Sequence, residues 1–137
     1  MRVSATTLAL ALVLLSSWPT AAQERYGRVE EWLRALSEAG AAANYEAARD
    51  VLAGPDYPED VRTRLAGLLA RTFKGQPFES ESVTILPSER NWERRLIALF
   101  GNGRYLYVGV VLHRRESGWI AVHFDADPNY GVVARGL

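Results

Sequence analysis

The stretch that decides the fold lies near the C-terminus and reads Gly118-Trp119-Ile120-Ala121-Val122-His123-Phe124-Asp125-Ala126-Asp127. Its side chains alternate in character with a period of two residues, which is typical of a β-strand with two different faces. Strict alternation divides the segment into an inner set, Ile120, Val122 and Phe124, and an outer set, Trp119, Ala121 and His123. The rest of the chain is interpreted as the elements that pack around this strand.

Three earlier segments alternate in the same way and predict further strands at residues 83–86, 92–100 and 104–113. Gly101-Asn102-Gly103 separates the last two and predicts a hairpin turn, because glycine and asparagine accept a positive φ at low cost. Connections as short as these require antiparallel pairing. The C-terminal half of the chain is therefore predicted to be a four-stranded antiparallel meander.

The two faces of this meander differ in composition. The inner face is aliphatic and continues with Leu106, Val108, Val110 and Leu112. The outer face is predicted to carry Tyr105, Tyr107, Val111 and Trp119, together with Ile97 and Leu99. A sheet face that contacts water is expected to be polar. The aromatic outer face therefore predicts that something covers it.

Three amphipathic helices are predicted before the sheet, at residues 25–39, from Asn44 to the Gly54-Pro55 break, and from Pro58 to Gly75. Each has a single apolar face, so each is expected to pack on a core supplied by the sheet. Helices followed by an antiparallel sheet predict an α+β fold.

The N-terminus has the layout of a secretory signal peptide over residues 1–22. Arg2 precedes an uninterrupted apolar run at residues 8–15, and small residues precede Gln23, so cleavage is expected after Ala22. The run is shorter than the roughly 20 apolar residues that span a bilayer. Residues 23–137 are then expected to form a single domain that is periplasmic or secreted. The chain has no cysteine, so neither a disulfide nor a lipid-modified cysteine is expected.

Charge excludes two classes of partner. The chain has 16 basic and 16 acidic residues, and signal cleavage removes only Arg2. A near-neutral protein with dispersed arginines lacks the basic surface that nucleic acid or an anionic membrane requires.

The order of the elements resembles the cystatin-like α+β superfamily, which includes the nuclear-transport-factor-like (NTF2-like) and SnoaL-like proteins. The resemblance lies in helices followed by a curved antiparallel meander that closes with the Gly-Trp-aliphatic strand from Gly118 to Phe124. The chain looks most like small exported bacterial proteins of unassigned role in that superfamily. The resemblance implies a cone-shaped sheet around a pocket, frequent homodimers formed sheet to sheet, and roles that range from enzyme to scaffold.

Catalysis is the alternative that the histidines leave open. Enzymes of the superfamily often carry a His and an Asp inside the cone, and His123 with Asp125 would be that pair in a small hydrolase or isomerase. Strand parity places His123 and also His113 on the outer face, away from any cone pocket. A non-catalytic role is therefore favoured.

No metal or cofactor site is expected. His113, His123 and Asp125 lack a local ligand spacing. The segment from Asp125 to Gly131 fails as a calcium loop, because its glycine comes one position late and Gly136 stands where the bidentate glutamate belongs. It is interpreted as a turn that leaves the sheet, whereas Glu79 and Glu81 are interpreted as solvated residues at a sheet edge.

The outer face is thus the candidate functional surface, with Tyr105, Tyr107 and Trp119 as its interface residues. Protein interfaces are enriched in Trp and Tyr. A homodimer is the predicted assembly, and docking on a different protein is the alternative. A bulge that shifts parity would instead bury some of these rings in the core. A small apolar ligand between the helices and the sheet is a further expectation.

Overall fold

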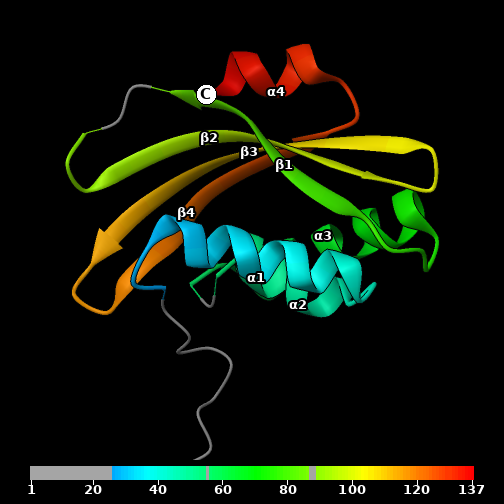
Figure 1. Cartoon of the computed structure of the whole chain (residues 1–137), viewed down its shortest axis with the longest axis horizontal. Coiled ribbons are helices and arrows are strands. Elements are labelled where there is room, and N and C mark those ends of the chain that lie inside the picture. Colours follow the sequence, from blue (N-terminus) through cyan, green and yellow to red (C-terminus); the bar gives the residue numbers. More distant parts are fainter. Residues whose placement is uncertain (1–25, 55, 87–88) are drawn as a thin grey trace, which may run out of the picture.

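The computed structural model describes residues 26–54, 56–86 and 89–137, and at its centre is a curved antiparallel sheet (Figure 1). Its strands are β1 (Glu79–Leu86), β2 (Trp92–Gly101), β3 (Arg104–Arg115) and β4 (Gly118–Asp127), in the spatial order β1-β2-β3-β4. The predicted meander and α+β fold are confirmed. The predicted signal peptide and its cleavage site lie outside the described residues.

Helices cover both faces of this sheet (Figure 1). On one face, here called the inner face, lie α1 (Val29–Ala41), α2 (Tyr45–Leu52) and α3 (Glu59–Phe73). On the other, the outer face, lies the short helix α4 (Tyr130–Gly136), which the sequence did not predict. No helix within the described ranges is long and apolar enough to cross a membrane.

The helix boundaries follow from local chemistry. The side chain of Asn44 accepts a hydrogen bond from the backbone N–H of Ala47 at 3.1 Å and so caps the start of α2. Glu59 and Asp60 occupy the first turn of α3, where the helix dipole favours carboxylates. Lys74 ends α3 in a left-handed conformation, with φ of 52°.

The hairpin register corrects the predicted outer position of Ile97 and Leu99. The tight turn at Asn102-Gly103 pairs Leu99 with Leu106 and Ile97 with Val108. Residues directly opposite each other in an antiparallel pair share a face. Both side chains are therefore on the inner face, where they are fully buried in the core.

A β-bulge in β4 corrects the predicted faces of the closing strand. Val111 pairs with His123, but the next residue of β3, Leu112, pairs with Ala121, so Val122 is an extra residue. An extra residue reverses parity on one side of the bulge. Trp119 therefore lies on the inner face and Ile120 on the outer face, whereas Phe124 keeps its predicted inner position.

The core between the helices and the inner face is filled by large side chains. The indole N–H of Trp32, a fully buried residue of α1, donates to the carbonyl oxygen of Val51 in α2 at 3.0 Å and satisfies its polar group. The largest side chains buried with it are Leu36, Leu52, Leu69, Phe73, Phe78 and Leu106. Gly40 lets the end of α1 approach β1, because a Cβ there would lie 2.5 Å from the carbonyl oxygen of Phe78.

Candidate functional site

Four aromatic rings form a continuous row on the outer face, here called the aromatic strip. They are Phe100 from β2, Tyr105 and Tyr107 from β3, and Tyr130 from α4. Successive ring centroids are 4.6, 5.8 and 5.5 Å apart. Phe100, Tyr105 and Tyr130 are 41%, 51% and 44% exposed. Contiguous exposed apolar patches are common at interaction sites, so the aromatic strip is the candidate functional surface.

Carboxylates flank the aromatic strip on both sides. Glu79 pairs with Phe100 and Glu81 pairs with Ala98, so both side chains lie on the outer face at the free edge of the sheet. Asp127 pairs with Tyr107 at the opposite edge, and its Oδ1 accepts the backbone N–H of Asn129 at 2.7 Å. We call these three residues the acidic rim. Within the described ranges, none of them forms an ion pair with an arginine or lysine.

Helix α4 fixes one end of the strip and seals the middle of the outer face. Val133 is fully buried over Gly109, whose missing side chain leaves room for it. Arg94 donates to the terminal carbonyl oxygen of Leu137 at 2.6 Å and anchors the end of the chain. The side chain of Asn129 caps the helix at Gly131. Of the predicted turn from Asp125 to Gly131, only residues 128–129 lie between elements, because β4 extends to Asp127 and α4 begins at Tyr130.

The residues predicted for an interface separate between the two faces. Tyr105 and Tyr107 lie on the outer face as predicted. Trp119 does not join them, because the bulge places it on the inner face. Its backbone N–H donates to the carbonyl oxygen of Tyr26 at 2.7 Å, and this bridge pairs with β4 along the edge where β4 has no neighbouring strand. The interface role of all three residues stays a prediction.

The two histidines lie on the outer face, as strand parity predicted. His113 stacks on Trp92 with ring centroids 3.9 Å apart. His123 is exposed, and Asp125 lies two residues further on the same face of β4. Neither His123 nor Asp125 points into the space between the helices and the sheet, where the catalytic alternative requires them. In the part of the chain that the structure describes, no group of three metal-ligating side chains comes together.

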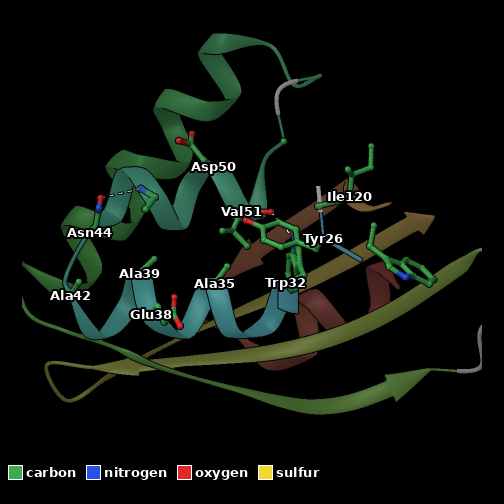
Figure 2. A pocket seen from close by; sticks show the side chains of 14 residues that line it. Tyr26, Trp32, Ala35, Glu38, Ala39, Ala42, Asn44, Asp50, Val51 and Ile120 are labelled. Carbon is green, nitrogen blue, oxygen red and sulfur yellow. Dashed lines mark hydrogen bonds between the residues drawn. The ribbon is translucent and has the colours of Figure 1, made fainter. Parts of the chain in front are cut away.

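A cleft of about 430 Å³ lies between α1 and α2 (Figure 2), and Tyr26 and Trp119 are among its lining residues. Glu38 from α1 and Asp50 from α2 stand on its opposite walls (Figure 2). Asp50 is already neutralised, because it accepts hydrogen bonds from both Arg49 and Arg62. The rest of the lining is mainly small and apolar, and includes Ala35, Ala39, Ala42, Ala47 and Val51. The small apolar ligand predicted between the helices and the sheet stays a prediction.

A second hollow, of about 660 Å³, opens beside the aromatic strip. It lies at the junction of α1 with the start of β1, and Glu79 and Phe100 belong to its lining. Ser37 and Ser80 also line it, and their hydroxyl oxygens are 2.8 Å apart. The hollow therefore continues the strip around the edge of the sheet.

Two polar groups on the inner side have no counterpart in the sequence analysis. Arg95 is a buried charge of β2, and it pairs with Glu93 and contacts the hydroxyl of Ser82 at 3.3 Å. The hydroxyl of Tyr57 has no hydrogen-bond partner of good geometry in the described part of the chain. Burial raises the pKa of Tyr57, and the nearby backbone of Phe124 partly opposes this rise.

A solved structure shares this architecture. It is the crystal structure of an NTF2-like protein of unknown function from Shewanella baltica OS155, with a TM-score of 0.51 and 15% sequence identity. The match covers 74% of this chain and 92% of that chain. The chain has the NTF2-like fold. No protein-family model matches the chain, and no curated protein matches it. At this identity the likeness establishes the NTF2-like fold and leaves the function to be argued from the site.

The aromatic strip contains two members that the sequence analysis missed. Phe100 follows from the hairpin rule, because a two-residue turn that pairs Gly101 with Arg104 necessarily pairs Phe100 with Tyr105. Tyr130 joins only because the C-terminal segment folds back as α4. The cap at Asn129, two residues before Gly131, was the available signal for that helix.

Proposed function

We propose that the protein is an exported, non-catalytic interaction module that dimerises through the aromatic strip. The observation that supports this most directly is the row of four rings in mutual contact, three of them more than two-fifths exposed. Aromatic rings bury large areas and lose little conformational freedom, so they anchor protein interfaces.

The size of the strip indicates a weak dimer. A fully exposed aromatic side chain presents about 200 Å², so Phe100, Tyr105 and Tyr130 together offer about 300 Å². A standard interface buries about 800 Å² on each partner. The strip would form the centre of such an interface, and the exposed side of α4, where Val132 is 38% exposed, would have to contribute to the remainder.

Sedimentation velocity of the mature protein tests this proposal. We expect a reversible dimer that forms at micromolar to millimolar concentration. Tyr105→Asp places a charge at the centre of the strip and should leave only monomer. Val83→Asp is the matched control, because Val83 is 48% exposed at the bulge of β1 and lies outside the strip. A monomer over the whole concentration range would refute the proposal, as would equal effects of the two variants.

Export is a separate part of the proposal, and it is supported by the signal-like sequence of residues 1–22. The mass of the protein recovered from the periplasm or medium should correspond to a chain that begins at Gln23. Recovery of the uncleaved chain in the cytoplasm would contradict this part and leave the dimer proposal untouched.

A further inference from the structure

We infer that the aromatic strip and the acidic rim together form a docking site for a cationic protein segment, an extended run rich in arginine or lysine. The inference rests on the part of the proposed function that makes the aromatic strip an interaction surface, and it names a different occupant for that surface. Three features of the molecule support it independently: the charge of the rim, the faces of the rings, and the end of helix α1.

The charged residues in the strand rows of the aromatic strip all have one sign. Glu79, Glu81 and Asp127 border the rings on both edges, and the rows of the outer face that hold Tyr105 and Tyr107 contain no arginine or lysine. The nearest cation along the chain, Arg104, pairs with Gly101 and belongs by register to a row of the inner face. The whole chain has equal numbers of basic and acidic residues, so the excess of carboxylates here is local.

The rings add a second attraction for cations. An arginine or lysine that lies over the face of a tyrosine is attracted by the negative potential of the ring, and the planar guanidinium of arginine also stacks on it. The rings of Tyr105 and Tyr107 are stacked and nearly parallel, with 6° between their planes. A cationic side chain that lies between the two edges of the acidic rim would therefore contact the exposed rings of the aromatic strip.

The hollow beside the strip supplies the third feature. It is lined by Glu79 and Phe100 and lies at the C-terminal end of α1. The C-terminal end of a helix carries partial negative charge and favours cations. Although backbone N–H groups already donate to the carbonyl oxygens of Glu38, Ala39 and Gly40, the last turn of α1 contains no basic residue. A lysine or arginine from a partner would fill this role with Glu79 as its counter-ion.

The geometry also sets the length of the segment. Strands lie about 4.8 Å apart, so the distance from Glu81 on β1 across the sheet to Asp127 on β4 is about 14 Å. An extended chain covers this distance with about four or five residues. Two cationic side chains four residues apart, which point to the same side of an extended segment and lie about 13–14 Å apart, would reach both edges of the rim.

A second copy of the chain fits the same surface less well. In a two-fold symmetric dimer the same patch contacts itself, so the acidic rim would lie near its own symmetry mate. Like charges oppose such a dimer, and salt screens this repulsion. Dimerisation should therefore strengthen as salt rises, whereas binding of a cationic segment should weaken. The two occupants compete for one surface and respond to salt with opposite signs.

Fluorescence anisotropy with labelled peptides tests the inference on the mature protein. The probe is a short peptide of alternating arginine and glycine, and the controls replace every arginine by glutamine or by glutamate. We expect the arginine peptide to bind and to lose about tenfold in affinity between low salt and 0.5 M salt. The double variant Glu79→Gln/Glu81→Gln should weaken binding about 3- to 10-fold, the range expected for two surface ion pairs. Tyr105→Ala should weaken it as well.

The matched control is the double variant Glu89→Gln/Glu116→Gln, which removes the same charge from exposed positions outside the two rim rows. It should leave the affinity within twofold. The inference falls if the arginine peptide binds no better than the glutamine peptide, or if the two double variants weaken binding equally. If it falls while sedimentation still gives a dimer that Tyr105→Asp dissociates, the proposed function stands alone. If neither association is found, both are refuted.

Discussion

The close contact between Gly109 and α4 makes a sharp prediction about the outer face. A Cβ added at Gly109 would lie 2.9 Å from Cγ1 of Val133 and 3.0 Å from Cδ1 of Leu137. Carbon atoms pack optimally at about 3.5–4.0 Å. Alanine therefore requires the side chains of Val133 and Leu137 to move away by about half an ångström or more. Valine adds two further methyl groups at the same point and requires the helix itself to move.

Whether α4 stays docked depends on how its docking energy compares with the cost of overpacking at Gly109. Burial of Val133, whose exposed fraction is 0%, stabilises the docked helix by about 1.5–3 kcal/mol. The hydrogen bond from Arg94 to Leu137 adds about 1 kcal/mol. Overpacking costs about 1–3 kcal/mol, occasionally more. Gly109→Ala should thus keep α4 docked, whereas Gly109→Val should bring the cost close to the whole docking energy and release the helix.

Hydrogen exchange of the α4 amides measures this directly. We expect near-normal protection in Gly109→Ala and a large loss of protection in Gly109→Val, accompanied by tryptic cleavage after Arg135. Valine also favours strand backbone by up to about 1 kcal/mol, so global stability need not fall in step. Gly67→Ala in α3 is the control, since it should stabilise that helix by roughly 0.5–1 kcal/mol and leave α4 unaffected. Unchanged α4 protection in Gly109→Val would refute the reasoning.

Two further predictions concern single groups in the core. Tyr57→Phe should be neutral or stabilising by up to about 1 kcal/mol in urea denaturation at pH 7, because the buried hydroxyl has no good partner to lose. Burial raises the pKa of Tyr57 in the folded state, so the unfolded chain releases that proton first as the pH rises, and the free energy of unfolding should fall above about pH 10. Tyr57→Phe should lack the part of this fall that Tyr57 causes. Identical dependences of the unfolding free energy on pH in the parent and the variant would contradict this account. Gly40→Ala should destabilise by about 3 kcal/mol or more, because its Cβ would meet the backbone and ring of Phe78, and a thermal midpoint within two degrees of the parent would disprove that contact.

Much of this architecture was predictable because local signals agree with one another. The periods of apolar residues, the cap at Asn44 and the turn at Asn102-Gly103 each specify an element within a few residues of sequence. The predicted strands and helices therefore appear in the predicted order. The start of β1 was missed, since Glu79 to Ser82 are polar and pair through their backbone at a sheet edge, where alternation is weak.

The errors in the face assignment have a different origin. Parity is reliable only while every residue of a strand has one partner, and Val122 breaks that condition in β4. Nothing in the local sequence distinguishes this residue from its paired neighbours, so the inner position of Trp119 follows only from the whole sheet. Ile97 and Leu99 are different, because the hairpin rule alone would have placed them opposite Val108 and Leu106.

The aromatic character of the candidate site was predictable from the sequence, but only some of its residues were. Tyr105 and Tyr107 follow from alternation along one strand. The acidic rim depends on pairing between separate strands, and Tyr130 depends on a helix of seven residues that is stable only because it packs on Gly109. Sites assembled by tertiary contacts of this kind leave almost no signature in a single segment of sequence.

The length of α4 explains why part of the outer face is left uncovered. A helix of seven residues is about 10 Å long, whereas strands of 10–12 residues extend for about 33–40 Å. The inner face receives three helices, whereas α4 can shield only the middle of the outer face around Gly109. The aromatic strip begins where that cover ends, with Tyr130 at the junction. The chain therefore covers its own sheet as far as its last helix reaches, and the exposed rings that remain are the part of the fold that a partner would complete.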